Sequence, residues 1–145
     1  MSNPSKDKGT RKETTAKRYL QSSGWPDCDR QPLRGGRDHG DLIVCRNPVV
    51  IAEVKYRDRA FSDAQAMRWL EETEREAVHA GADLGVLIVA RKGVRVEYWD
   101  AVMAANDWML ILSGDQVLPT DAPWPLRASL ADWSRMALAW VEGGA

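Results

Sequence analysis

The spacing of apolar residues divides this sequence into short strand-like runs and longer helix-like segments. The most informative run is DLIVCRNPVVIAEVK, residues 41–55, in which two apolar stretches flank an Arg-Asn-Pro break and predict a β-hairpin. The continuous apolar run LGVLIVA predicts a central buried strand, and the alternation in VRVEYW predicts a half-exposed one. Strands are therefore expected at residues 28–33, 42–45, 49–54, 84–90 and 94–99.

Apolar residues in the other segments recur every three or four positions, as on one face of a helix. Ser62 and Gln65 fit a capping box, and Gly24 fits a helix end, as do the glycines at 81 and 114. The run WMLIL, inside the third helical segment, fits a strand equally well. Helices are expected from residue 9 or 10 to 22 or 23, from 62 to 80, from 100 to 112 and from 126 to 141.

The helix from 62 to 80 lies between two predicted strands, so this part of the chain is expected to form a βαβ unit with parallel strands. Its charged run at 71–76 is expected to form mainly a solvated face. The buried stripe of this helix is expected to comprise Ala66, Met67, Leu70, Ala77 and Val78. In the last helix, an apolar stripe with two tryptophans is expected to pack on its own domain, and a subunit contact is the alternative.

Charged residues end the second strand of the predicted hairpin. Because side chains alternate along a strand, Glu53 and Lys55 share one face with Val49 and Ile51. A strand that is apolar on both faces has no structural reason to end in a carboxylate and an ammonium. Asp41, at the start of the neighbouring strand, can lie beside them. Such a group suits a hard divalent cation and a phosphate, whereas an ordinary surface pair of Glu53 with Lys55 is the alternative.

Glu13 is a second unusual carboxylate, because its spacing to Ala16 and Leu20 places it on the core-facing side of the first helix. It can reach the same cation from there. The alternative is a first-turn acid favoured by the helix dipole, or one paired with Lys17.

The segment RGGRDHG, residues 34–40, leads into Asp41 and predicts a flexible basic loop that can approach a ligand closely. A plain hairpin turn is the alternative. His39 in this loop is expected to be exposed rather than a metal ligand.

Composition and charge narrow the class of protein. With 145 residues, 44% hydrophobic and 28% charged, the chain is expected to form one globular domain. Residues 1–60 carry a net positive charge and the remainder a net negative one, so an acidic partner is expected to bind the N-terminal half. Cys28 and Cys45 lack zinc-site spacing and are expected to be reduced core thiols. Without a signal peptide or a membrane-length apolar run, the protein is expected to be soluble and cytoplasmic, with no membrane partner.

The pattern Asp-(x11)-Glu-Val-Lys after a glycine-rich loop resembles the PD-(D/E)xK nuclease superfamily. More narrowly, the segment from Lys8 to Glu13, KGTRKE, resembles the K-G-x-x-x-E start of archaeal-type Holliday junction resolvases. The likeness continues through the pairs Tyr-Leu at 19–20 and Gly-Trp at 24–25, the two glycines at 35–36 and Asp-Leu at 41–42. It covers roughly residues 8 to 99.

This resemblance implies an α/β fold with a restriction-endonuclease-like core, in which helices flank a mixed central sheet in the order αβββαβ. It divides the chain into a flexible basic tail at 1–8, a nuclease core at 9–99 and an extra C-terminal helical extension at 100–145, packed on the core or at a dimer interface. The implied activity is metal-dependent, structure-selective hydrolysis of DNA by a homodimer acting on Holliday junctions. Flap, nick, mismatch or restriction substrates, and a non-catalytic DNA-binding module, are the alternatives.

The resemblance also implies residue roles. The catalytic set would be Glu13, Asp41, Glu53 and Lys55, the three acids binding Mg²⁺, with Mn²⁺ as a substitute, and Gln65 would be an orienting residue. Branched or duplex DNA would be contacted by Lys8, Arg11, Lys12, Arg30, Arg34, Arg37 and Arg57. The chain departs from the family pattern at Gly40, where a proline is common, and in a longer loop that lacks a serine. These departures leave the choice of DNA structure open.

Overall fold

The computed structural model describes residues 4–31, 41–115 and 124–144. Within these ranges the helices are α1 (Pro4–Ser22), α2 (Asp63–Ala80), the short 3-10 helix η1 (Val96–Tyr98), α3 (Ala105–Ser113) and α4 (Leu130–Glu142). The strands are β1 (Asp29–Arg30), β2 (Leu42–Arg46), β3 (Val49–Arg57), β4 (Leu84–Arg91), β5 (Asp100–Ala104) and β6 (Pro125–Ser129). None of the described helices is both long enough and apolar enough to cross a membrane.

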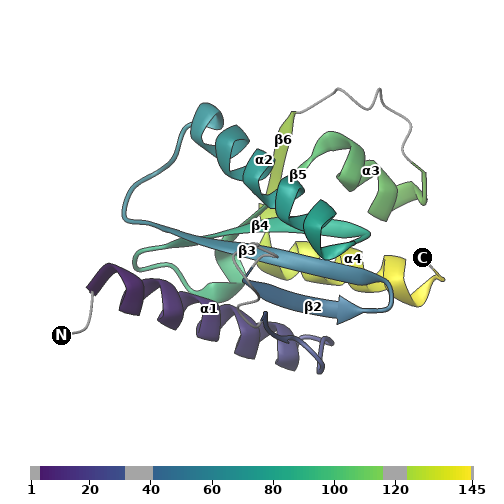
Figure 1. Ribbon diagram of the computed structural model, residues 1–145, viewed down its shortest axis with the longest axis horizontal. Coiled ribbons are helices and arrows are strands. Elements are labelled where there is room, and N and C mark those ends of the chain that lie inside the picture. Colours follow the sequence, from purple (N-terminus) through teal and green to yellow (C-terminus); the bar gives the residue numbers. More distant parts are fainter. Residues whose placement is uncertain (1–3, 32–40, 116–123, 145) are drawn as a thin grey trace.

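The strands form one open mixed sheet in the order β1-β2-β3-β4-β5-β6. Only β3 and β4 run parallel, and α2 connects them; the other neighbouring strands are antiparallel. Helices cover the sheet, with α1 along the β2–β3 side and α2 across β3 and β4 (Figure 1). The fold is therefore an α/β architecture, and the predicted order αβββαβ is confirmed from α1 to β4.

Both faces of β3 and β4 are buried, as their continuous apolar sequences predict. On one face, Val50, Ala52 and Val54 join a core that also contains buried residues of α1 and α4. On the other face, Leu87 and Val89 pack with Ala66 and other residues of α2. Since side chains alternate along β3, the positions of Glu53 and Lys55 are on the α2 side of the sheet.

The hairpin of β2 and β3 is confirmed, with a turn at Asn47-Pro48, whose peptide bond is cis. Helix α2 also begins as predicted, because the Ser62 side chain accepts a hydrogen bond from the Gln65 N–H at 3.1 Å. It ends at Gly81, which adopts a left-handed conformation with φ of 63°. The thiols of Cys28 and Cys45 are free, and Cys28 is buried.

The prediction of a strand at 94–99 is wrong. Within this segment Val96–Tyr98 form the 3-10 helix η1, and Trp99 is buried with its Nε1–H donating to the Val94 carbonyl at 2.9 Å. The strand follows instead as β5, where a helix beginning at Asp100 was expected. Five residues of continuous apolar sequence do not distinguish a buried strand from the start of a buried helix. WMLIL belongs to helix α3, so the expectation of a helix is confirmed for this run and the alternative of a strand is wrong.

The prediction of one helix from 126 to 141 is wrong at its start. Residues 125–129 form β6, and α4 begins after Ser129, whose side chain caps the helix by accepting the Asp132 N–H at 3.1 Å. Residues 100–145 were expected to be a helical extension, but they also supply two strands of the sheet. Leu130, Trp133 and Ala137 are buried, so the expected packing of α4 on its own domain is confirmed.

Two element boundaries in the N-terminal part also differ from expectation. Helix α1 begins at Pro4 rather than near Gly9, so residues 4–8, expected to belong to a flexible tail, are helical. A single glycine inside a helix costs only about 1 kcal/mol, so Gly9 does not stop it. The strand expected within 28–33 is limited to Asp29–Arg30 where the structure describes it.

Candidate functional site

The β2–β3 hairpin places Asp41 beside the middle of β3, next to Glu53. The Asp41 N–H donates to the Ala52 carbonyl at 3.1 Å, continuing the pairing of Leu42 with Ala52. Asp41 Oδ2 accepts a hydrogen bond from the Val54 N–H at 2.8 Å. The carboxylate of Asp41 is therefore fixed by the backbone of the strand that holds Glu53.

Burial raises the pKa of Asp41 from 3.8 to about 8, and the nearby carboxylate of Glu53 adds to this effect. The charge of Glu13 also raises it, whereas the Val54 N–H and the ammonium of Lys55 oppose the rise. The charges of the other three residues of the predicted catalytic set thus all act on Asp41. A cation beside Asp41 would favour its charged form.

Lys55 connects the strand with helix α2. Its Nζ lies 3.5 Å from Glu53 Oε1 and 3.3 Å from Glu72 Oε2. Burial by itself would lower the pKa of Lys55, but the carboxylates of Glu53 and Glu72 outweigh it and raise that pKa above its ordinary value. Lys55 is therefore a charged donor at neutral pH, held between two carboxylates.

Two carboxylates of α2 belong to this site. One ligand atom each of Glu53, Glu72 and Glu76 can lie within 4.8 Å of the others, a group that can hold a metal ion. Glu53 is 5% exposed and Glu76 is 2% exposed. Asp41 and Glu53 on the hairpin, with Glu72 and Glu76 on α2, are called the carboxylate site below.

The expectation that residues 71–76 form mainly a solvated face is confirmed for Glu71, Glu74 and Arg75, which are exposed, but is wrong for Glu76, which is buried, and Glu72 is half-buried. A signal for Glu76 is present in the sequence, because it is three residues beyond the buried Thr73 and continues the stripe formed by Ala66 and Leu70. Val78, expected in this stripe, is instead 78% exposed.

Glu13 lies on the side of α1 that faces β1. Its Oε2 accepts a hydrogen bond from Arg30 Nη2 at 2.7 Å, and its side chain is 18% exposed. The described ion pair therefore joins Glu13 to Arg30 rather than to Lys17. Arg30, predicted to contact phosphate, is bound to this carboxylate.

The structure holds the other predicted DNA-binding residues in different ways. Lys12 Nζ lies 5.1 Å from the ring centroid of Tyr56 and 5.5 Å from that of Trp99. The guanidinium of Arg57 lies 4.8 Å from the Trp69 ring centroid. Arg11 is exposed on α1. The side chains of Lys8, Arg34 and Arg37, and the loop residue His39, lie outside the part of the chain whose side chains are described.

Gln65 is not brought to the carboxylates. Its Oε1 accepts a hydrogen bond from Arg68 Nη2 at 2.9 Å, and the residue lines a cavity at the β3–α2 connection. Its capping role through the backbone N–H is confirmed.

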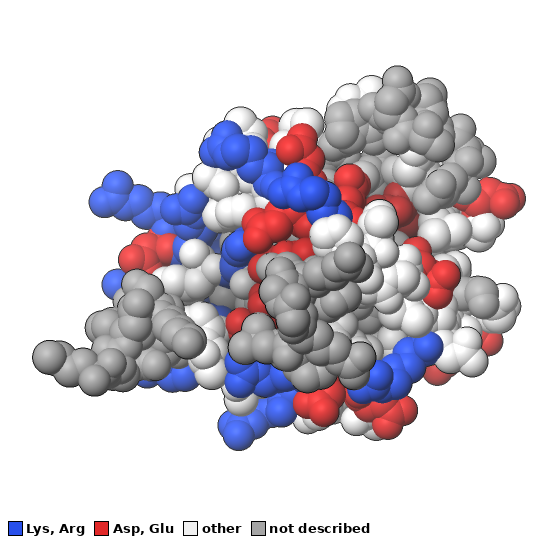
Figure 2. Space-filling view, viewed as in Figure 1, with Lys and Arg blue, Asp and Glu red and all other residues white. Residues whose placement is uncertain are grey.

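Acidic side chains gather at the centre of the molecule, and basic side chains lie around the end of β3 and the first turns of α2 (Figure 2). Carboxylates are the ligands that hard divalent cations prefer, and a lysine next to them can stabilise an anionic oxygen. The arrangement is therefore chemically suited to a cation and a phosphate. Comparison of the chain with protein-family models, with curated proteins and with solved structures gave no match in any of the three.

Proposed function

We propose that this protein is a metal-dependent DNA endonuclease of the PD-(D/E)xK type that hydrolyses phosphodiester bonds in branched DNA, with the four-way junction as its substrate. The observation that supports the proposal most directly is the meeting of Asp41, Glu53 and Lys55 at one end of the β2–β3 hairpin. These are the three residues of the Asp-(x11)-Glu-x-Lys pattern, and the fold brings them together from two strands.

Each residue has a separate task in this proposal. Asp41 and Glu53 would hold Mg²⁺, with Mn²⁺ as a substitute and Glu13 as an additional carboxylate. The cation neutralises phosphate charge and makes a bound water more acidic. Lys55, kept protonated by Glu53 and Glu72, donates a hydrogen bond to the developing anionic oxygen. Glu72 holds the Lys55 ammonium in place at 3.3 Å.

The high pKa of Asp41 supports a cation in this role. A carboxyl group that burial and neighbouring carboxylates keep protonated is a poor ligand by itself, but a divalent charge beside it reverses that balance. Several carboxylates lie together in the partly buried carboxylate site, and a bound cation would be a common ligand partner for them.

One other candidate is favoured by the ion pairs of Lys55. Its contacts with Glu53 and Glu72 would equally stabilise a DNA-binding module that has this fold but no catalytic activity. The distinction is measurable, because such a module binds DNA without metal-dependent cleavage.

The test is cleavage of a synthetic four-way junction in Mg²⁺, compared with a linear duplex and a flap of the same sequence. We expect paired nicks in the junction that EDTA abolishes. Glu53→Gln and Lys55→Ala should each lower the cleavage rate about 100-fold or more, because each removes a group that acts on the reacting phosphate.

Matched control variants separate this effect from a general change of charge. Glu142→Gln and Lys92→Ala alter exposed residues outside the carboxylate site and should leave the rate unchanged. Preferential cleavage of the flap or linear duplex would assign another substrate within the same superfamily. Absence of cleavage with every DNA would refute the nuclease.

A further inference from the structure

A cavity of about 520 Å³ lies beside the carboxylate site, at the connection between β3 and α2. Its lining comes from the end of β3, the connecting loop and the first turn of α2. The lining residues that carry the argument are Arg57, Arg59, Ser62 and Gln65. We call this hollow the loop cavity.

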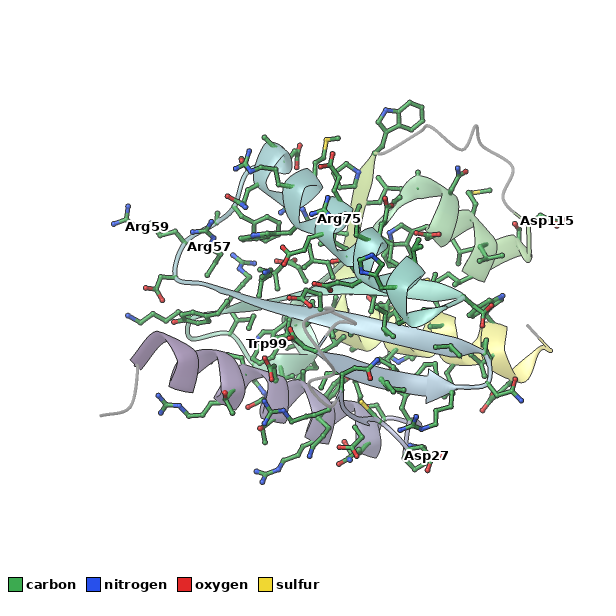
Figure 3. All side chains as sticks on the ribbon, in the orientation of Figure 1. Asp27, Arg57, Arg59, Arg75, Trp99 and Asp115 are labelled. Carbon is green, nitrogen blue, oxygen red and sulfur yellow. The ribbon has the colours of Figure 1, made fainter. Side chains whose placement is uncertain are left out.

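Two arginines give the loop cavity its charge. Arg59 is exposed and, among the residues that the structure describes, has no ion pair. Arg57 is held by its stacking on Trp69 rather than by a carboxylate. Arg57 ends β3 and Arg59 follows in the connecting loop, as the labels in Figure 3 show. Asp58 also lines the cavity, but its carboxylate accepts a hydrogen bond from the Tyr56 hydroxyl.

The loop cavity is in line with the carboxylate site. Side chains alternate between the two faces of a strand, so Glu53, Lys55 and Arg57 share one face of β3. At about 3.3 Å per residue, the four steps along β3 from Glu53 to Arg57 span about 13 Å. Each step of a DNA strand combines a rise of about 3.4 Å along the helix axis with a turn around that axis, so neighbouring phosphates lie roughly 6–7 Å apart and this distance corresponds to about two phosphates.

The donors of the loop cavity match phosphate oxygens. A guanidinium binds phosphate through two parallel N–H groups, and the side-chain amide of Gln65 keeps its N–H₂ donors because its Oε1 accepts from Arg68. Arg57 also has little freedom to lose on binding, since Trp69 already orients it.

We propose that the loop cavity binds the sugar-phosphate backbone of the DNA strand about two nucleotides from the bond that the carboxylate site cleaves. Arg57 and Arg59 bind the phosphates, and Gln65 donates a further hydrogen bond. This inference rests on the proposed function for the position of the cleaved bond. The inference adds a second contact with DNA to the proposed function. This contact determines which phosphodiester along the strand lies at the carboxylate site.

The experiment measures DNA binding in EDTA, where no cleavage occurs, as a function of salt concentration. The probe is a fluorescein-labelled four-way junction followed by fluorescence anisotropy. Each phosphate contact removed should lower the slope of log K against log salt by about 0.9. Arg59→Ala should therefore lower it by about one, and Arg57→Ala/Arg59→Ala by about two, with affinity falling about 5- to 10-fold for each contact at low salt.

Arg46→Ala is the matched control, because it removes the same charge at the turn joining β2 to β3, away from the loop cavity. Its salt slope should equal that of the wild type. Arg59 is exposed, so its variant tests the site even if Arg57→Ala disturbs the packing of Trp69. Melting temperatures of all variants identify any such disturbance.

The outcomes separate the two proposals. If the wild type cleaves DNA and the Arg59→Ala variant has unchanged salt slope and affinity, the proposed DNA binding by the loop cavity is wrong and the proposed nuclease activity stands. If Arg59→Ala has a reduced salt slope and the wild type cleaves no DNA, the result supports DNA binding by the loop cavity and refutes the proposed nuclease activity. Titration with inorganic phosphate should give no saturable heat at millimolar concentration. Saturable binding of phosphate, with DNA affinity unchanged in Arg59→Ala, would assign the cavity to a free anion instead.

Discussion

Asp41 is a carboxyl group placed between a backbone donor and other carboxylates, and its protonation affects the stability of the fold. Because its pKa is about 8 in the folded protein and near 3.8 when exposed, the folded state binds more protons between these values. The contribution of Asp41 to the free energy of unfolding is therefore fully present at acidic pH and is lost as the pH rises from about 4 to about 8.

We predict that Asp41→Asn, which keeps an oxygen for the Val54 N–H, is more stable than the wild type at pH 8 in EDTA by about 2–4 kcal/mol. The measurement is urea denaturation between pH 5 and pH 8, where the wild type should lose stability more steeply than the variant. Asp27→Asn, at an exposed aspartate, serves as the control and should follow the wild type. Identical pH slopes in Asp41→Asn and the wild type would contradict this account.

At the scale of single residues, the sequence pattern predicts a set of Glu13, Asp41, Glu53 and Lys55, and in the structure the charges of the other three act on Asp41. Their selection depends on strand alternation and hairpin pairing, which are local. Glu72 and Glu76 are absent from the predicted site because they belong to a helix, and packing against the sheet decides which face of that helix is buried. The predicted buried stripe of α2 includes Met67 and Val78, whereas the observed stripe includes Thr73 and Glu76. The predicted stripe is therefore rotated about the helix axis relative to the observed one, and it leaves Glu76 on the solvent side.

Helix ends are decided by local backbone conformation, and two glycines illustrate how far the sequence specifies them. Gly24, after α1, has φ of 105°, and Gly81, after α2, has φ of 63°. Both were predicted as helix ends. The sequence does not reveal that a Cβ at position 24 would lie 2.6 Å from Leu138 Cδ2 of α4, whereas a Cβ at position 81 would meet nothing within 4 Å.

We predict that Gly24→Ala destabilises the protein by about 2–3 kcal/mol, because it combines an unfavourable positive φ with a clash against Leu138. Gly81→Ala should cost only about 1 kcal/mol, since strain acts there alone. Urea denaturation of both variants measures the difference. Equal losses would show that α4 does not pack as closely on Gly24 as the structure indicates.

The misplaced elements have a common cause. The segment from 94 to 104 contains an alternating run followed by a continuous apolar run, and local alternation predicts the strand in the first of these runs. In the structure the alternating run contains the 3-10 helix η1 and the buried Trp99, and the continuous run is β5. A strand between two neighbours is selected by long-range pairing, here of Val102 with Leu87 and with Arg127, which no local pattern contains.

At the scale of the whole molecule, the sheet extends beyond the part that resembles a nuclease core. Strand β4 pairs with β5, and β5 pairs with β6, so residues after 99 complete the sheet. Met103, Leu130 and Trp133 from this part are fully buried in the core that α1 also covers.

We predict that a chain ending at Trp99 does not fold cooperatively, because it loses two strands and the buried side chains of α4. A chain lacking only the last three residues is the control and should unfold like the full chain. Far-UV circular dichroism and urea denaturation distinguish the two. A sharp unfolding transition of the chain ending at Trp99, with native-like circular dichroism, would show that the first 99 residues are an independent domain.

The parallel pairing of β3 with β4 has a consequence for synthesis on the ribosome. The hairpin of β2 and β3 contains only near-neighbour pairings, so Asp41 and Glu53 can meet while the chain is short. Glu72 and Glu76 reach Glu53 only when α2 packs on the sheet, and α2 precedes β4, the strand against which it packs. A growing chain therefore exposes an incomplete set of carboxylates until the central strands have emerged. The complete site should arise only after translation has passed β5.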